Sequence, residues 1–323
     1  MNFYVKSILG FVISLVLMLI VMPFYIKSLK KHNINQEVSE YALEEYKQKE
    51  KTPIMGGLLF VLIPSIVFCI IDFKALSEAS TLMVLLSYVL YCLVGFLDDY
   101  LIIFRRDNNG LSPKLKLLME LVFAILVFII FRNSLSFEIA VPFIHKAIKL
   151  SALIFLPLII IMYLGESNAV NFTDGMDGLC AGVSSISLIG YLVILAVCKE
   201  YNVFILVSCI IGGLFGYLKF NYHPAQIFMG DSGSIALGGL FSAIALITNS
   251  EIALLFIGGT FLGEMFCVCL QQISVRLFHK RVFAYTPIHY AFVIKGHKET
   301  TVVKRFYLLT LILVVIGVLI GLL

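Results

Sequence analysis

The sequence predicts an all-α polytopic integral membrane protein with about ten transmembrane helices. Of its 323 residues, 60% are hydrophobic and only 14% are charged, and the mean hydropathy is +1.01. This composition is far more apolar than that of a soluble domain. Apolar runs close to the ~20 residues needed to cross a bilayer recur along the whole chain. We therefore treat residues 1–323 as a single transmembrane domain and expect no nucleic-acid partner.

The apolar runs follow one another from the first residues to the last. The first run is too long for a signal-peptide core and no small-residue cleavage site follows it, so we expect a retained span. The ninth run is longer than a straight crossing requires, and Gly258, Gly259 and Gly263 favour a tilt, kink or break in it. The expected spans are Ile8–Ile26, Pro53–Ile71, Thr81–Leu97, Leu117–Phe131, Leu150–Gly165, Leu179–Val197, Val203–Lys219, Ile235–Thr248, Ile252–Phe278 and Phe306–Leu323.

The distribution of basic residues predicts the orientation of these spans. Most of the 24 Lys and Arg residues fall on one side of the membrane, chiefly in the loops 27–51, 105–116 and 276–305. The positive-inside rule assigns that side to the cytoplasm, so both termini face outside. The polar motifs described below all fall on the cytoplasmic side. A transporter would be expected to place its ionisable groups near the membrane midplane instead.

Two other patterns have structural interpretations. Apolar residues alternate with other residues from Leu135 to Phe143 on the outer side, which predicts a short β-hairpin or edge strand. Seven cysteines lie in or beside apolar runs without a Cys-x-x-Cys pair. We expect buried thiols that form neither disulfides nor a metal site.

A polar loop, Asn168 to Leu179, lies at the end of the fifth span. It reads Asn-Ala-Val-Asn-Phe-Thr-Asp-Gly-Met-Asp-Gly-Leu. The glycines allow a tight turn and a close approach to a ligand, while the oxygen-rich side chains can accept hydrogen bonds or hold a hard cation. An alternative role for Asp177 is that of N-cap of the next helix. That role would leave Asp174, Asn168 and Asn171 unexplained.

Asp98 and Asp99 are adjacent acids at the end of the third span. Successive helical residues point about 100° apart, so at least one of the two must face a polar cleft. Two carboxylates this close repel each other, which favours protonation of one or recruitment of a divalent cation. The alternative is a pair of interfacial acids in water.

The segment Phe228-Met229-Gly230-Asp231-Ser232-Gly233-Ser234 precedes the eighth span. Asp231 or Ser232 could simply cap that helix. The segment also offers a carboxylate, two hydroxyls and free backbone N–H groups at a helix N-terminus, where anions bind. Phe228 could stack on a flat ring, or it could be a membrane anchor or core residue.

Two cytoplasmic helix starts carry basic residues. Ser112-Pro113 predicts an N-cap followed by a first turn that contains Lys114 and Lys116, which oppose the helix dipole and indicate an anionic partner. Lipid headgroups alone would satisfy Lys114. Thr286-Pro287 predicts the start of a short amphipathic helix that carries His289. Histidine suits proton transfer or phosphate contact, although a single histidine is also compatible with an ordinary interface.

These motifs occur in order behind Lys51-Thr52-Pro53-Ile54-Met55-Gly56-Gly57. In this combination the chain resembles the polyprenyl-phosphate N-acetylhexosamine-1-phosphate transferases, and most of all the branch that uses UDP-MurNAc-pentapeptide. The resemblance covers almost the whole chain. It implies a membrane enzyme of bacterial peptidoglycan and cell-wall synthesis. Such an enzyme transfers phospho-MurNAc-pentapeptide from UDP-MurNAc-pentapeptide to undecaprenyl phosphate, forms lipid I and UMP, and requires Mg²⁺. A homodimer is a further expectation from the family.

The resemblance also implies roles for single residues. Asp231 would be the Mg²⁺ ligand, and either Asp98 or Asp99 would orient or deprotonate the lipid phosphate. Phe228 would stack on uracil. The residues implied to take part in catalysis are Asp98, Asp99, Asp231 and His289. Those implied to bind substrate are Lys49, Lys116, Asn168, Asn171, Asp174, Asp177 and Phe228.

The chain departs from the family pattern at Ile102, where the family usually has lysine, and at Tyr290-Ala291, where it usually continues a run of histidines. Two other functions remain open. A sister transferase would use UDP-GlcNAc or another UDP-sugar. An ion-coupled transporter is favoured only by Glu264, an acid within the ninth span that could instead bond to a neighbouring helix.

Overall fold

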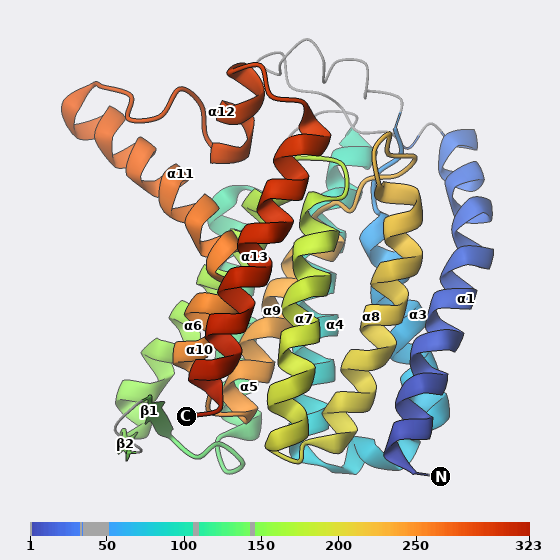
Figure 1. Cartoon of the computed structure of the whole chain (residues 1–323), viewed down its shortest axis with the longest axis vertical. Coiled ribbons are helices and arrows are strands. Elements are labelled where there is room, and N and C mark those ends of the chain that lie inside the picture. The colour runs from blue at the N-terminus through green and yellow to red at the C-terminus, as the bar shows by residue number, and fades with distance from the viewer. Residues whose placement is uncertain (1, 33, 35–51, 106–109, 143–145) are drawn as a thin grey trace.

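The computed structural model describes residues 2–32, 34, 52–105, 110–142 and 146–323, which form a bundle of helices with a two-stranded sheet at one end (Figure 1). Nine of the ten expected spans each coincide with one helix, and the ninth coincides with two. In the described part of the chain, seven helices are long and apolar enough to cross a membrane. They are α1 (Phe3–Lys31), α4 (Ala79–Arg105), α6 (Ala152–Thr173), α7 (Leu179–Val197), α8 (Tyr201–Asn221), α11 (Gly259–Phe278) and α13 (Glu299–Gly321). The multi-pass, all-α prediction is confirmed.

Three further helices complete the expected spans. The apolar helices α3 (Gly56–Ile71) and α9 (Asp231–Ile247) are shorter, and α5 (Pro113–Phe131) carries charged residues in its first two turns. Ser112 is the N-cap of α5, as predicted, and its hydroxyl accepts the backbone N–H of Leu115 at 3.3 Å. A short 3₁₀ helix, η1 (Phe73–Ser77), links α3 to α4.

The ninth expected span is broken into two helices, which agrees with the break that its glycines predicted. The helix α10 (Glu251–Ile257) ends and α11 begins on either side of Gly258. Figure 1 shows α11 diverging from the rest of the bundle, and the chain then turns back to the short helix α12 (Ile288–Ile294), which lies near the start of α13. The Thr286-Pro287 prediction is confirmed, because α12 begins directly after Pro287.

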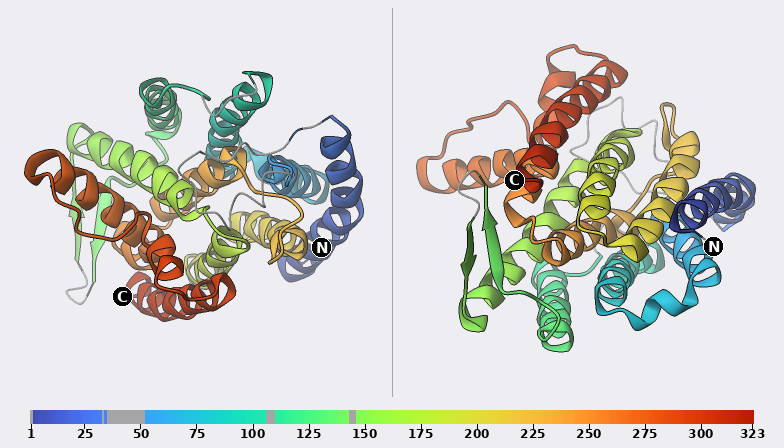
Figure 2. Two further views of the ribbon diagram at one scale, coloured as in Figure 1. Left: turned by 90° about the horizontal axis from the view of Figure 1, so that it is seen from above. Right: turned by 60° about the horizontal axis from the view of Figure 1, so that its bottom comes forward.

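The hairpin lies at the opposite end of the bundle from α12. Its strands β1 (Glu138–Val141) and β2 (Lys146–Lys149) are antiparallel, with Glu138 opposite Lys149. Both termini lie at this same end (Figures 1 and 2). The hairpin prediction is confirmed, although Phe143 lies outside the described residues.

All seven cysteines are free, as predicted. Five of them are buried or half-buried. Cys198 and Cys269 are exposed on the protein surface, so the expected burial was wrong for these two. Cys198 is the C-cap of α7 and therefore lies at a helix end rather than within the bundle.

The helix α9 is the buried centre of the bundle, in contact with α3, α4 and α6. The first turns of α9 approach α3 and α4 closely because a glycine lies at each of the two contacts. Gly57 of α3 lies against the backbone of Gly233, and Gly95 of α4 lies against the backbone of Asp231. Small residues permit this kind of backbone approach between membrane helices. The N-terminus of α9 is thereby fixed between α3 and α4.

The segment before α9 pairs with the start of α3 through backbone hydrogen bonds. The N–H of Gly56 donates to the carbonyl of Phe228, and that of Gly57 donates to the carbonyl of Met229, each at 2.8 Å. The N–H of Phe228 donates in turn to the carbonyl of Pro53 at 2.8 Å. The Thr-Pro-Ile-Met-Gly-Gly motif therefore holds the segment that precedes Asp231.

A methyl group at position 57 would collide with the backbone of Gly233 and the carbonyl oxygen of Met229. We expect Gly57→Ala to lower the stability by ~1–3 kcal/mol through overpacking, and so to lower the Tm of the purified protein. Gly263→Ala is the control, because a Cβ there meets nothing within 4 Å and alanine is the better helix former. Equal melting of the two variants would contradict this packing.

Candidate active site

The polar motifs converge at the end of the bundle opposite the termini (Figure 1). This end collects the last turns of α4 and α6, the first turn of α9 and the helix α12. Asp231 is the first residue of α9, and its carboxylate is contacted by several of the polar side chains gathered at this end. Its Oδ1 accepts the side-chain amide of Asn171 at 2.7 Å, and its Oδ2 pairs with the ammonium of Lys116. The side chain is 23% exposed, so a ligand can reach it.

The adjacent acids of α4 have different partners. Both oxygens of Asp99 accept backbone N–H groups, from Asp231 and Ser232, each at 3.0 Å. Asp99 is therefore the cap of α9, supplied from another helix, and its side chain is almost fully buried. Asp98 accepts the N–H of Leu111 at 2.7 Å and faces Asp231. Of the pair, Asp98 is the acid that faces the cluster.

Asp231 and Ser232 do not cap α9 with their side chains, contrary to the alternative drawn from the sequence. The N-cap is Gly230, whose φ of 74° suits glycine, and it makes no side-chain cap bond. Asp231 and Ser232 instead donate their backbone N–H groups to Asp99. The carboxylate of Asp231 is consequently left for the cluster.

Asp174 joins the cluster from the C-terminus of α6. It accepts the backbone N–H of Gly230, the residue directly before Asp231. Burial raises the pKa of Asp174 to about 7, and the nearby negative charge of Asp231 adds to the effect. The charge of this carboxyl group therefore changes close to neutral pH.

Asp177 bonds to a different set of residues. Its Oδ2 accepts the N–H of Ala225 at 3.1 Å and lies 2.9 Å from Nδ1 of His223. Its own N–H donates to Glu299 at 2.8 Å. The alternative role of Asp177 as an N-cap was wrong, because α7 is capped by Gly178 at a φ of 77° without a side-chain bond. The ligand atoms of Asp177, His223 and Glu299 lie within 4.8 Å of one another, close enough to hold a metal ion.

A buried acid that sequence reasoning missed lies behind Lys116. Glu120 is fully buried, and it accepts the side-chain amide of Asn168 at 2.7 Å and the hydroxyl of Ser167 at 3.0 Å. Asn168 therefore contacts Glu120 rather than Asp231. The negative charges of Asp231, Asp98 and Glu120 all act on the ammonium of Lys116. Its spacing from Lys116 could have identified Glu120 from the sequence, because residues 116 and 120 share one face of an apolar helix.

The helix α12 closes over the Asp174–Gly178 loop. Glu264 of α11 accepts the N–H groups of Ile288 at 2.7 Å and His289 at 3.2 Å, and it lies 3.1 Å from Nδ1 of His289. The other ring nitrogen, Nε2, is buried without a hydrogen-bond partner among the described residues and lies against Gly175. Tyr290 donates its hydroxyl to the carbonyl of Gly175 at 2.8 Å.

Two expected site residues complete the set. The backbone of Phe228 is fixed by its bonds to Pro53 and Gly56, and its side chain is half-buried beside the cluster residues that follow it in sequence. Lys49 lies outside the described residues.

Comparison with known proteins agrees with this arrangement. The family model described as Glycosyl transferase family 4 matches residues 81–249, which span α4 to α9. The phospho-N-acetylmuramoyl-pentapeptide-transferase of Bacillus subtilis is 37% identical over 96% of this chain and 95% of its own length. That of Halalkalibacterium halodurans is 35% identical over 96% of each chain. That of Campylobacter jejuni is 37% identical over 95% of this chain and 92% of its own.

This chain belongs to the phospho-N-acetylmuramoyl-pentapeptide-transferase family. The resemblance predicted from the motifs is confirmed. The region matched by the Glycosyl transferase family 4 model contains the Asp98–Asp231 cluster, whereas α12 and its His289 lie beyond it. Membership of the transferase family rests on nearly the full length of the chain.

The separate partners of the two adjacent acids can be tested by substitution. Asp99→Asn turns an amide NH₂ group towards a buried backbone N–H, which should lower the stability by ~1–3 kcal/mol and lower the Tm. Asp98→Asn retains an oxygen for Leu111, so the Tm should change little while turnover falls by ~10²-fold or more. Equal losses of Tm in the two variants would show that Asp99 is not the cap of α9.

The raised pKa of Asp174 should make stability depend on pH. Its pKa of about 7 in the folded protein lies above the ordinary value of about 4, so folding retains a proton that the unfolded chain releases between these two values. Relative to Asp174→Asn, the wild type should be equally stable near pH 4, lose stability as the pH rises towards about 7, and change no further above it. Melting curves in Mg²⁺-free detergent measure this. A Tm difference that does not vary with pH would contradict it.

Proposed function

We propose that the protein transfers phospho-MurNAc-pentapeptide from UDP-MurNAc-pentapeptide to undecaprenyl phosphate, forming lipid I and UMP for peptidoglycan synthesis in the bacterial cell membrane. The observation that carries this proposal is the Asp98, Asp174 and Asp231 cluster with Lys116 at one end of a membrane bundle. The full-length likeness to transferases of this name supports it. A sister transferase for another UDP-sugar is the alternative.

The transporter alternative loses the feature that motivated it. Glu264 is held by the N–H groups of Ile288 and His289 and by the ring of His289. These contacts give the acid a structural role at the start of α12. The other acids lie at one end of the bundle, as suits a soluble donor that meets a lipid acceptor.

We assign the clustered end to the cytoplasm and both termini to the outside. The positive-inside count supports this assignment, since most basic residues lie in the loops at the clustered end. The nucleotide donor is charged and would approach from that compartment. A homodimer stays a prediction from the family resemblance.

Magnesium fits the side chains of the cluster. Mg²⁺ prefers oxygen ligands and is usually bound by one or two carboxylates together with substrate phosphates. Asp98 and Asp231 supply such oxygens, and Asn171 fixes the orientation of Asp231. We assign Asp231 as its ligand. When bound there, Mg²⁺ would neutralise the charge of the donor pyrophosphate. The Asp177, His223 and Glu299 set includes a nitrogen and suits this hard cation less well.

In the reaction, an oxygen of the lipid phosphate forms a bond to the β-phosphorus of the donor. The bond from that phosphorus to the bridging oxygen breaks, and UMP leaves with the oxygen. Phosphoryl transfer of this kind depends on positioning and on charge stabilisation. We assign Asp98 to orient or deprotonate the lipid phosphate, because both oxygens of Asp99 are occupied by α9. Lys116, beside Asp231, would offset phosphate charge.

The remaining residues would hold the donor. Nδ1 of His289 faces the carboxylate of Glu264, and Nε2 has no partner among the described residues. Nε2 is buried against Gly175, so it would contact a phosphate only if the loop at Gly175 moved aside. Asn171 and Asp174 would line the nucleotide site, and Phe228 would stack on uracil. Asp177 would shape this site through its bonds to the α8–α9 connection rather than by contact with Asp231.

Release of UMP from purified protein with undecaprenyl phosphate tests the proposal directly. We expect Mg²⁺-dependent release from UDP-MurNAc-pentapeptide, none from UDP-GlcNAc, and loss of release when EDTA removes the metal. Asp231→Asn should lower the rate by ~10²-fold or more while the Tm stays close to that of the wild type. Gly263→Ala serves as a control, because a Cβ at this position meets nothing within 4 Å.

Each other outcome has a definite meaning. Release only from UDP-GlcNAc would move the protein to the sister transferases. Release that continues unchanged in EDTA would remove the role assigned to Mg²⁺. No release from either donor, from protein that melts cooperatively, would overturn the proposed function.

A further inference from the structure

The buried acid Glu120 has one oxygen that is bound and one that is not. Its Oε2 accepts the side-chain amide of Asn168 at 2.7 Å and the hydroxyl of Ser167 at 3.0 Å. Its Oε1 is also buried, and no donor in the described part of the chain bonds to it. A buried acceptor without a donor is costly and therefore calls for an explanation. The proposed reaction gives Glu120 no role.

Lys116 lies one turn before Glu120 on the same face of α5. Side chains four residues apart on a helix are neighbours, with Cβ atoms about 5–6 Å apart. The ammonium of Lys116 pairs with Oδ2 of Asp231, and the structure shows no ion pair between Lys116 and Glu120. The negative charges of both acids nevertheless act on this ammonium. Lys116 thus lies within reach of two carboxylates and is bound to one of them.

The ammonium of Lys116 and a metal ion compete for the carboxylate of Asp231. Like charges repel, so a cation already paired with this carboxylate weakens the binding of a divalent cation there. The ammonium occupies Oδ2, while Oδ1 accepts the side-chain amide of Asn171. Metal binding at Asp231 therefore favours a second position for the Lys116 ammonium, away from Oδ2.

The carboxylate of Glu120 is fixed, whereas the side chain of Lys116 can move. Ser167 and Asn168 hold Oε2 from α6, and the hydroxyl of Tyr91 on α4 donates to the backbone carbonyl of Glu120 at 2.9 Å. These bonds fix the direction of Oε1 as well, because the two oxygens belong to one planar group. The ammonium of lysine is carried on a flexible four-carbon stem. A new contact between the two residues would therefore form by movement of Lys116.

We propose that Glu120 is a positioning residue, whose Oε1 receives the ammonium of Lys116 when Asp231 holds Mg²⁺. The inference rests on the proposed function, from which Asp231 is taken as the metal ligand. The exchange gives Oε1 a charge-assisted hydrogen bond and frees Oδ2 of Asp231. It also keeps the positive charge of Lys116 beside the cluster, where that charge offsets those of the phosphates. Asn168 and Ser167 then serve the metal site indirectly, by orienting Glu120.

The test measures Mg²⁺ binding in the absence of both substrates. The Tm of the purified protein in detergent is followed as Mg²⁺ is added at constant ionic strength. A ligand that binds only the folded state raises the Tm with its concentration, which gives an apparent Kd. The proteins are the wild type, E120Q, K116M and the double variant E120Q/K116M. In D231N the Tm should not rise, which separates this site from any other that binds the ion.

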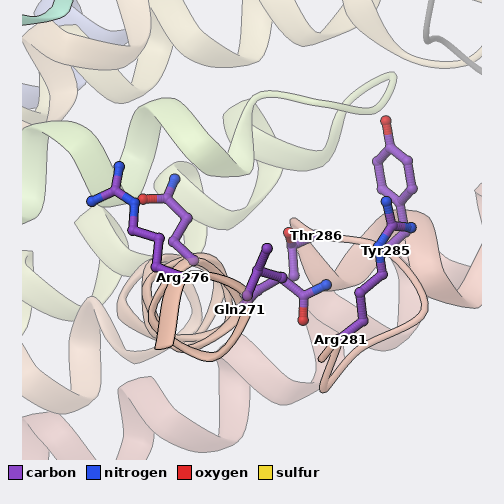
Figure 3. Close-up of a pocket in the computed structure, with 7 residues that line it drawn as sticks. Gln271, Arg276, Arg281, Tyr285 and Thr286 are labelled. Atoms are coloured by element: carbon purple, nitrogen blue, oxygen red, sulfur yellow. The ribbon is translucent and has the colours of Figure 1, made fainter. Parts of the chain in front are cut away.

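Two controls match the charges that are removed. E166Q neutralises another fully buried acid, which also has an unpartnered oxygen but lies against Gly258. R281Q removes a positive charge, as K116M does. Arg281 lines a cavity of about 320 Å³ beside the end of α11, and none of the residues of the carboxylate cluster lines that cavity (Figure 3). Both controls should have the apparent Kd of the wild type.

We expect E120Q to raise the apparent Kd for Mg²⁺ by ~10-fold, because Lys116 loses its second acceptor and stays on Asp231. K116M should lower the apparent Kd by ~10-fold, because it removes the competing cation. In the K116M background, E120Q should change the apparent Kd by less than about twofold, since no ammonium is left to move. If E120Q melts early, E120D keeps the charge, draws the carboxylate back by one methylene and should give an intermediate value.

Several results would overturn the inference. An increase caused by E120Q that is equal with Lys116 and with Met at position 116 would show that Glu120 attracts the ion directly, through space. An unchanged apparent Kd in E120Q would show that Oε1 does not receive the ammonium. An apparent Kd raised by K116M would show that Lys116 supports the metal rather than competes with it.

The proposed function fails in a different way. A wild-type Tm that does not rise with Mg²⁺ would overturn both this inference and the assignment of the metal to Asp231. Normal Mg²⁺ binding with the expected changes in E120Q and K116M, but no release of UMP by the wild type, would overturn the proposed reaction alone.

Discussion

The carboxylate of Asp99, bound to the first two N–H groups of α9, is the contact on which the geometry of the site depends. Helix N-termini leave N–H groups unsatisfied and attract negative charge, so a buried acid there both caps and anchors the helix. The close approach of Gly57 and Gly95 permits α3 and α4 to hold the same turn. Because α9 begins at this fixed point, Asp231 is presented to Asn171 and Lys116 rather than used as a cap.

A second buried acid repeats this arrangement at the start of α12. Glu264 lies in an apolar helix, which is expensive for an ionisable group and usually indicates function. Here its two oxygens satisfy the N–H groups of Ile288 and His289 and orient the imidazole of His289. The break at Gly258 allows α11 to diverge from the bundle and carry this acid out to α12. Asp99 thus positions the start of α9, which carries Asp231, and Glu264 positions the ring of His289. Such positioning by buried supporting residues is typical of a rigid catalytic site.

Local features of the sequence predicted local features of the structure. The spans, the cap at Ser112 and the helix after Pro287 depend on neighbours in the chain and were found from it. Asp98 and Asp99 looked equivalent because their partners, Leu111 and the start of α9, lie far away in sequence. The alternative role of Asp177 as a cap was wrong for the same reason, since Asp177 bonds to residues more than forty positions away. Long-range packing therefore decided which acids face the carboxylate cluster and which cap a helix.

The carboxylate cluster and the α11–α12 unit differ in how the bundle holds them. The acids of α4, α6 and α9 gather around the start of a buried helix, so the packing of the bundle fixes their positions relative to one another. The α11–α12 unit is attached to the rest of the bundle through fewer hydrogen bonds, among them those of Thr260 with Thr310 and of Tyr290 with Gly175. Tyr290 stands where the family usually continues a run of histidines, yet its hydroxyl keeps α12 on Gly175. We infer that this departure alters how the donor's outer groups are held and leaves the carboxylates and Lys116 as they are.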